Sequence, residues 1–245
     1  MATTYVNPYS FINAKYAAGL DAIIMALPPS PPVPYTLDNL ADAIYNYLQA
    51  TYFMMDTPDA LEIQEMKIWT AEAINGYINL GIETAAYLPF STAQMSFVNQ
   101  LVNGVLDVRN PEDIEQYILD IEHKLTCSGL NTIEQAPLLY GTAVARAAYN
   151  YWKVKGFDPM SSWIGYVTSF TPAINKFPFW VSASAAGALI SLNTSKSKTD
   201  NELVSAIERV SDDRRGWSIL HALTGSMAVV SGKIIFNVQQ RANCC

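Results

Sequence analysis

Charged residues are scarce in this chain of 245 residues: they make up 15% of it, whereas hydrophobic residues make up 50%. A typical soluble domain is about one quarter charged. The surface is therefore short of charge, and we expect much of it either to be buried against partners or to meet lipid. The net charge is acidic, −7. An acidic chain repels phosphate backbones, so we expect no nucleic-acid partner.

Cysteine is also rare, and the three cysteines do not form a disulfide framework. Cys127 stands alone, and Cys244 and Cys245 are adjacent, a pattern typical of a protein from a reducing compartment. The adjacent pair resembles the prenylation signal of Rab GTPases, but no GxxxxGK[ST] loop accompanies it, so we interpret it as a frayed tail. Residues 1–20 lack the basic and continuous apolar regions of a signal peptide. We therefore expect cytoplasmic synthesis, and the final location, within a larger particle or elsewhere, stays open.

Residues that carry catalysis are equally sparse. His123 and His221 are the only histidines, and only His123 has a carboxylate three positions before it. A carboxylate-bridged di-metal bundle requires about four carboxylates and two histidines, so we interpret Asp120, Glu122 and His123 as the solvated face of a helix. Cys127 could pair with His123 as thiolate and imidazole, but no third group accompanies them, and a small core residue is the favoured interpretation. The chain also lacks GxSxG, HExxH and a glycine-rich phosphate loop, and we predict no enzyme, no cofactor and no metal site.

What the chain does contain is helical periodicity. Apolar residues recur at spacings of three and four, and capping residues, prolines or glycines separate the runs. No segment alternates apolar and polar residues over more than a few positions. We predict an all-α protein, a multi-helix bundle of about eight to nine helices around a central apolar helix at 131–155, with no substantial β-sheet. The expected helices lie at 7–27, 36–52, 58–87, 91–106, 111–129, 131–155, 177–195, 199–215 and 216–238, and a proline-rich connector lies at 28–34.

Capping side chains mark several of these helix starts. Asn7 is followed by a proline, which predicts a helix start there, and either Ser91 or Thr92 predicts another. Asn110 is followed by Pro-Glu-Asp, which is the clearest start signal in the chain because the two acids lie at the positive end of the helix dipole.

The segment 131–155 has the features of a central helix. Asn131 and Glu134 fit a capping box. Pro137 lacks a backbone donor, which predicts a kink or a late start near Ala136. Apolar side chains cover most of the circumference, as expected for a helix at the centre of a core. Three small residues at spacings of four and three form a narrow packing seam that lets a neighbouring helix approach closely: Gly141, Ala145 and Ala148.

The amino-acid composition of the chain changes after this helix, which predicts that the protein consists of two structural parts. Residues 1–126 hold four basic against fifteen acidic residues, a net charge of −11, and residues 127–245 hold eleven against seven, a net charge of +4. Turn-forming residues concentrate between 156 and 176. We predict an acidic helical bundle at 1–155 and a small-residue-rich helical subdomain at 156–245 packed on it, with one single domain as the alternative. Gly225 and Gly232 form a second small-residue seam in the later part.

Aromatic residues crowd between 149 and 180. They could line a ligand pocket, form an interface cluster or form a membrane-interface belt, and an aromatic core corner is the favoured interpretation. We predict interaction or packing roles for Trp163, Trp180 and Trp217. The uncharged segment 177–195 approaches the ~20 residues that span a bilayer. It also contains a proline and several polar residues, among them Ser182, Ser184, Ser191 and Asn193, so we favour a buried or subunit-facing helix over a membrane span.

The run from Pro137 to Trp152, PLLYGTAVARAAYNYW, resembles a segment of uncharacterised helical proteins of Bacteroidota-type bacteria. Those proteins carry a Leu-Leu-x-Ala-Ser/Thr helix ending in Tyr-Trp, followed by a small-residue-rich tail similar to that of bacteriocin precursors. Residues 182–189 and 216–232 correspond to that tail here, although the charged segment 199–215 interrupts it. The resemblance covers about a quarter of the chain and implies a helical fold, and it transfers no site residue.

These features together predict a non-enzymatic structural protein that works by assembly. It would be a helical subunit, adaptor or packaged component of a larger complex, for example a virion or a secretion or injection assembly of bacterial or phage origin. Its partners would be other protein subunits in a homo- or hetero-oligomer. Two alternatives stay open. One is a membrane-active or toxin-like protein that inserts 177–195 and 216–238, although membrane contact is not favoured, and the other is a small-molecule binder with an aromatic pocket near 152–180.

Overall fold

The computed structural model describes residues 6–27, 37–51, 61, 64, 90–158, 160–163, 173–194 and 223. This part of the chain is mostly helical: it contains six α-helices, two 3-10 segments and no strand. The predicted all-α class is therefore confirmed for the described residues. The predicted total of eight to nine helices stays a prediction, because the expected elements at 28–34, 199–215 and nearly all of 58–87 and 216–238 lie outside them.

The first helix, α1, spans Ile12–Ala26. We expected it to begin at Asn7, and this is wrong, because the Asn7 side chain forms a turn instead: its Oδ1 accepts from the backbone N–H of Tyr9 at 2.9 Å. The chain leaves the helix at Leu27, whose backbone is extended (φ −78°, ψ 150°), directly before the proline that was expected to end it. The second helix, α2, spans Leu37–Thr51, as the apolar spacing predicts.

The next helix, α4, spans Thr92–Val102 and begins at the predicted cap. Ser91 Oγ accepts from the N–H of Gln94, and Gln94 Oε1 accepts from the N–H of Ser91 at 3.0 Å. This reciprocal pair is a capping box, which satisfies two backbone donors at once. A 3-10 turn, η3, follows at Gly104–Asp107.

The start signal around Asn110 is also confirmed, although its first turn is tighter than an α-helix. Asn110 Oδ1 accepts from the N–H of Glu112, and Pro111–Asp113 form the 3-10 turn η4. The helix α5 then spans Ile114–Thr126. Gly129 follows with φ 76°, a left-handed conformation that glycine adopts without strain.

The long helix α6 spans Thr132–Lys155. Its capping box is confirmed: Asn131 Oδ1 accepts from the N–H groups of Ile133 and Glu134, and Glu134 Oε2 accepts from the N–H of Asn131. The predicted late start near Ala136 is wrong, because the helix begins at Thr132 and contains Pro137.

The last described helix, α8, spans Ala173–Thr194 and thus begins four residues before the predicted start at 177. Its Pro178 is the sixth helical residue, as Pro137 is in α6. A proline at this position leaves the carbonyl four residues earlier without its helical donor. The strong cap of α6 and the packing of both helices offset that loss.

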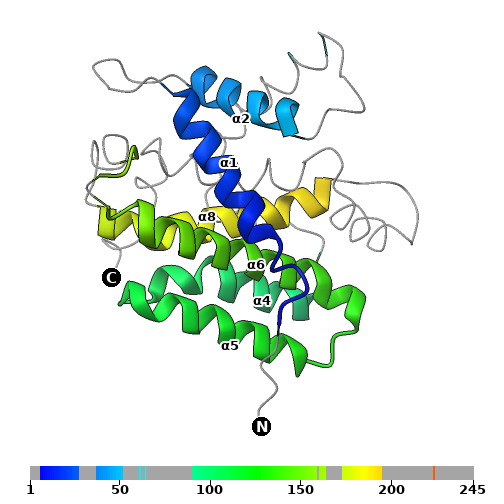
Figure 1. Cartoon of the computed structure of the whole chain (residues 1–245). Helices are drawn as coiled ribbons and strands as arrows, with labels where there is room; N and C mark the ends of the chain where they lie inside the picture. Colours follow the sequence, from blue (N-terminus) through cyan, green and yellow to red (C-terminus); the bar gives the residue numbers. More distant parts are fainter. Residues whose placement is uncertain are drawn as a thin grey trace, which may run out of the picture.

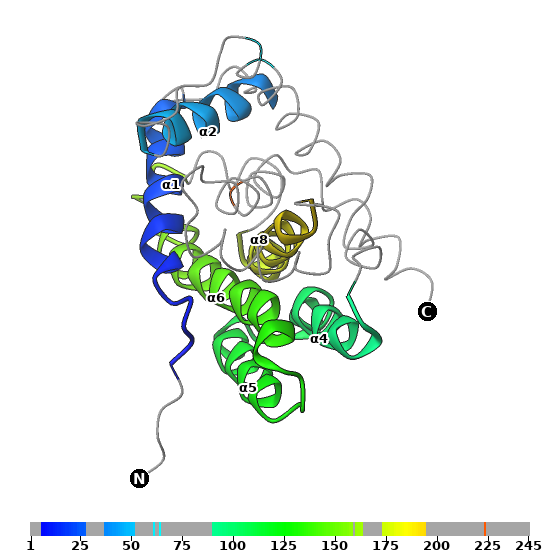
Figure 2. The same ribbon diagram turned by 90° about the vertical axis from the view of Figure 1, so that its right-hand side faces the viewer.

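The helices α6 and α8 form the centre of the molecule and pack against each other more extensively than any other described pair (Figures 1 and 2). From Ala136 to Trp152 every residue of α6 is buried except Arg146 and Asn150. In α8 every residue from 180 to 189 is buried. The expected central helix is therefore one of a central pair.

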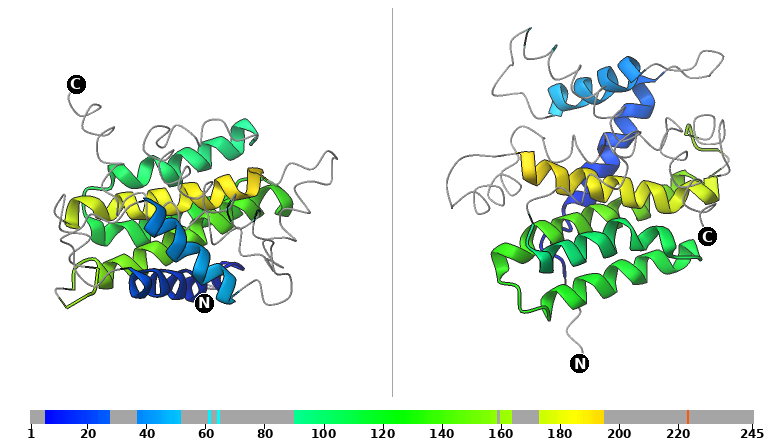
Figure 3. Two further views of the ribbon diagram at one scale, coloured as in Figure 1. Left: turned by 90° about the horizontal axis from the view of Figure 1, so that it is seen from above. Right: turned by 180° about the vertical axis from the view of Figure 1, so that it is seen from behind.

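The other helices surround this pair (Figure 2). α4 and α5 cover one side, α1 crosses α6 on another, and α2 packs on α1. The views from above and behind in Figure 3 show the same arrangement, with α8 beside α6. One hydrophobic core contains residues of α1, α2, α4, α5, α6 and α8. It therefore joins described residues of both predicted parts, 1–155 and 156–245.

Candidate functional site

The seam residues of α6 lie inside the chain. Ala145 and Ala148 have no exposed surface. A Cβ atom on Gly141 would lie 3.0 Å from Leu189 Cδ2 on α8 and 3.2 Å from Leu101 Cδ2 on α4. This close approach favours a glycine at 141, because a side chain there would press on the Leu189 and Leu101 side chains.

The two described tryptophans predicted as interaction residues, Trp163 and Trp180, are buried against Trp152. Trp152 and Trp180 stack with ring centroids 4.3 Å apart and an interplanar angle of 9°, and Trp163 meets Trp152 at 5.2 Å. All three are at most 1% exposed. Indole Nε1 of Trp180 has no hydrogen-bond partner within the described residues. The three rings thus pack tightly against one another, as expected for an aromatic corner of the core.

Three other predicted interaction residues, Trp217, Gly225 and Gly232, lie outside the described residues, as do Cys244, Cys245 and His221. Residue 223 is described, and its leucine side chain would lie 2.7 Å from a Cβ on Gly19 of α1. The small residue at position 19 therefore makes room for the leucine.

The histidine and cysteine considered for chemistry lie at the surface. His123 and Cys127 are exposed near the end of α5. The interpretation of Cys127 as a small core residue is therefore wrong, because α5 ends at Thr126 and leaves the next residue at the surface. Within the described part of the chain, no group of three or more His, Cys, Asp or Glu residues is placed to hold a metal ion. Asp120 is exposed, as expected for a solvated helix face.

Glu122 departs from that expectation, because it is 1% exposed and joins a buried polar cluster. Glu122 Oε1 accepts from Asn7 Nδ2 at 2.6 Å, and Arg146 lies 3.5 Å from Glu122 Oε2. Asn7 Nδ2 also lies within hydrogen-bond distance of Leu139 O and Thr142 Oγ1. An amide nitrogen has two hydrogens, so it satisfies two of these three acceptors at a time. The cluster fastens the segment before α1 to α5 and α6.

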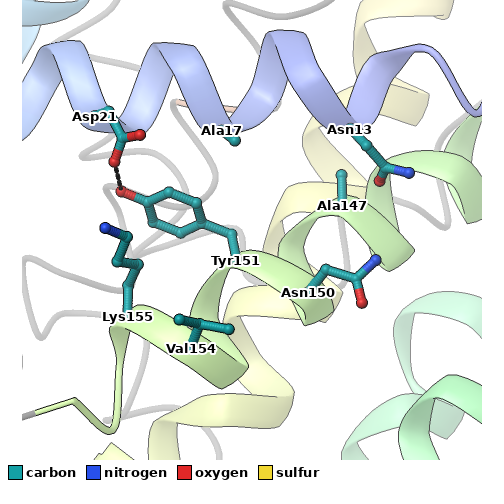
Figure 4. A pocket seen from close by; sticks show the side chains of 8 residues that line it. All are labelled: Asn13, Ala17, Asp21, Ala147, Asn150, Tyr151, Val154 and Lys155. Atoms are coloured by element: carbon teal, nitrogen blue, oxygen red, sulfur yellow. Dashed lines mark hydrogen bonds between the residues drawn. The ribbon is translucent and has the colours of Figure 1, made fainter.

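A groove of about 270 Å³ lies between α1 and α6 (Figure 4). Small residues, Ala17 and Ala147, line it where the two helices approach each other. Its remaining lining consists of one apolar and five polar side chains: Val154, Asn13, Asn150, Asp21, Tyr151 and Lys155. Val154 is 62% exposed. The groove is therefore a mixed apolar and polar surface open to solvent.

Tyr151 organises one end of the groove. Its hydroxyl donates to Asp21 Oδ1 at 2.8 Å and accepts from Trp163 Nε1 at 2.7 Å. Burial raises the pKa of the Tyr151 hydroxyl well above its ordinary range, and the neighbouring Asp21 carboxylate raises it further. Tyr151 is therefore a neutral hydrogen-bonding link between α1, α6 and the loop after α6, and a poor general base.

The other end of the groove carries two carboxamides. Asn13 on α1 and Asn150 on α6 both line it (Figure 4). Asn13 Oδ1 is shielded from water and has no hydrogen-bond partner within the described residues. Neither end combines a nucleophile with a base that orients it, which acyl or phosphoryl transfer requires.

The outward side of α1 continues this surface. We call it the outer α1 face and define it by seven residues: Phe11, Ala14, Lys15, Ala18, Asp21, Ala22 and Met25. Met25 is 86% and Phe11 is 44% exposed, and Ala14, Ala18 and Asp21 are exposed between them. α1 lies at one edge of the view in Figure 2, and Asp21 marks where this face meets the α1–α6 groove.

Comparison of the chain with family models, curated proteins and solved structures gives no match. None of the helices in the described part combines the length and apolarity needed to cross a bilayer. The functional argument therefore rests on the surfaces described above.

Proposed function

We propose that this protein is a non-enzymatic component of a larger assembly, a helical subunit, adaptor or packaged component that contacts other protein subunits. The observation that carries the proposal is the outer α1 face. A helix that is apolar nearly all round is stable when all its sides are covered. α1 has only two charged residues in fifteen, Lys15 and Asp21, yet it lies at the margin with Phe11 and Met25 in solvent.

The surroundings of α1 support the same proposal. Val154 at the end of α6 is 62% exposed, and Phe157 and Met160 in the following loop are 40% and 90% exposed. Single exposed apolar residues are ordinary on monomers, but several within a short stretch of chain, one of them lining an open groove, favour an interaction surface. The low fraction of charged residues favours this interpretation, because few charges are available to keep such a surface in water.

The non-enzymatic part of the proposal rests on the sequence. The chain has two histidines and none of the recognised nucleophile or phosphate-binding motifs. The polar side chains that line the α1–α6 groove are two amides, a neutral tyrosine, one carboxylate and one lysine. This set suits recognition of a partner better than bond cleavage.

Multi-angle light scattering on the purified protein tests the proposal. We expect the mass to rise with concentration from 27.0 kDa toward a multiple of it. A particle that stays at 27.0 kDa and freely soluble at high concentration would contradict it. Flotation with liposomes separates the membrane-active alternative, because an assembly subunit should remain in the aqueous fraction.

A further inference from the structure

Four aromatic rings form a continuous series that runs from the core to the α1–α6 groove. Trp180 stacks on Trp152 with ring centroids 4.3 Å apart, and Trp152 meets Trp163 at 5.2 Å. Trp152 also meets Tyr151 at 5.2 Å, edge to face. Electron transfer between aromatic rings weakens steeply with distance, so rings in contact exchange an electron far more readily than separated ones. The series therefore offers a path for an electron through the core.

Hydrogen bonds give this series a direction. Trp163 Nε1 donates to the Tyr151 hydroxyl at 2.7 Å, and that hydroxyl donates to Asp21 Oδ1 at 2.8 Å (Figure 4). A phenol that loses an electron becomes strongly acidic at its O–H group. The Asp21 carboxylate is already in place to accept the Tyr151 proton, so this tyrosine can lose its electron and its proton together.

The opposite end of the series lacks such an acceptor. Indole Nε1 of Trp180 is buried and has no hydrogen-bond partner within the described residues. An oxidised Trp180 ring therefore keeps its proton and its positive charge inside the core, where an isolated charge is costly. Electron transfer along the series removes that charge once Tyr151 is oxidised, because the proton then passes to Asp21.

We infer that this series conducts one-electron oxidation from the tryptophan cluster to Tyr151, with Asp21 as the proton acceptor. The oxidant belongs to the class of one-electron radical oxidants, and it takes one electron from an indole ring to leave a radical cation. Tyr151 then gives one electron to that indole and its hydroxyl proton to the Asp21 carboxylate. The products are a neutral indole, a neutral tyrosyl radical and a protonated Asp21 side chain. This inference is independent of the proposed assembly role.

The groove lets a soluble reductant repair the radical. Tyr151 lines this groove, which is open to solvent, although its own side chain is only 6% exposed. A reductant such as ascorbate in the groove supplies one electron to the tyrosyl radical, and the proton returns from Asp21 to the tyrosine oxygen. Oxidation of the core thus ends at a position where it can be reversed, instead of damaging a buried tryptophan.

Tyr149, also on α6, provides the contrast. Its hydroxyl accepts a hydrogen bond from Lys153 Nζ at 2.9 Å. An ammonium group has no lone pair with which to accept a further proton. Oxidation of Tyr149 would therefore leave its proton without a neighbouring base among the described residues, so Tyr149 is a poor end point for the series.

Pulse radiolysis of the full-length protein in azide solution tests the path, because the azide radical removes one electron from indole rings. Transient absorption follows the decay of the tryptophan radical and the growth of the tyrosyl radical. In the wild type we expect both changes to share one rate that is independent of protein concentration. Tyr151→Phe should lose this phase, whereas Tyr149→Phe, the matched control, should retain it.

Asp21→Asn tests the proton acceptor. The amide oxygen can still accept a hydrogen bond from Tyr151, but it is a far weaker base than a carboxylate. We expect tyrosyl radical formation to slow about tenfold or more, because a positioned base accelerates proton transfer by roughly 10²–10⁴-fold. Circular dichroism of each variant should match the wild type, which separates a lost proton acceptor from a folding defect.

Three results would overturn the inference. Wild-type kinetics in Tyr151→Phe would show that another tyrosine is the end point. An unchanged rate in Asp21→Asn would show that the carboxylate does not take the proton. A rate that rises with protein concentration would show that the electron moves between molecules. None of these results bears on the assembly role, which light scattering tests separately.

Discussion

The helices α6 and α1 have similar apolar textures but different surroundings. Both carry apolar residues around most of their circumference. Among the described elements, α6 packs against α1, α4, α5 and α8, whereas α1 packs mainly against α6 and α2 and leaves Phe11 and Met25 exposed. A helix that is apolar around most of its circumference must bury that surface. The comparison shows that the burial need not be completed by other helices of the same chain. The following experiments test that contrast.

The largest loss of stability is expected when a large side chain is removed from the centre of the core. Trp152→Ala removes a fully buried ring that stacks on Trp180 and contacts Trp163. We expect a loss of about 3–5 kcal/mol in the free energy of unfolding, measured by denaturant titration. Phe11→Ala, on the outer α1 face, is the matched control and should cost less than about 1 kcal/mol when the protein is dilute. Equal losses for the two variants would remove the distinction between covered and uncovered apolar surface.

A smaller loss of stability is expected when a larger side chain is introduced into the centre of the core. Ala145 has no exposed surface, so Ala145→Leu should cost about 1–3 kcal/mol and lower the thermal midpoint. Ala18→Leu adds the same atoms to an exposed position of α1 and should leave the midpoint of the dilute protein nearly unchanged. An Ala145→Leu protein with the wild-type midpoint would show that α6 does not pack as described.

The smallest effect is expected where the two helices are joined. Tyr151→Phe removes the hydroxyl that links Asp21 to Trp163, which should cost about 1–2 kcal/mol near neutral pH. The sign of the pH dependence follows from the raised pKa of Tyr151. The unfolded chain loses the tyrosine proton near pH 10, while the folded chain retains it. The contribution of Tyr151 to the free energy of unfolding is therefore fully present below about pH 10 and decreases as the pH rises above that value.

Unfolding followed by circular dichroism between pH 8 and pH 11 provides the measurement for Tyr151. The Phe variant should lose less stability than the wild type over that interval, because it has one fewer group to ionise on unfolding. A parallel decline of the two proteins would show that other tyrosines account for the alkaline loss.

Helix starts were predictable where the deciding interaction is local. Asn131 and Ser91 cap helices through hydrogen bonds to residues at most three positions away, so the sequence contains the whole signal. The start of α1 was missed for the opposite reason. Asn7 Nδ2 bonds Glu122, 115 positions away, and the Asn7 side chain holds a turn instead of opening the helix.

Burial of charged groups was the least predictable feature of the candidate surfaces. Glu122 occupies a helix whose pattern of charges suggests solvent on that side, yet Asn7 and Arg146 cover it. The link from Tyr151 to Asp21 joins residues 130 positions apart and had no signal in the sequence. Helical periodicity reports which faces are apolar, and it carries no information on which distant polar groups meet.

For the described part of this protein, the sequence by itself determined the helical class, the cap of α6 and the apolar character of 131–155. These properties depend on residues within one or two turns of each other. The tertiary structure alone decided that α8 shares the centre, that Glu122 is buried and that α1 keeps one apolar face in solvent. Those outcomes depend on how whole helices pack, because each helix can bury only the faces that its neighbours reach.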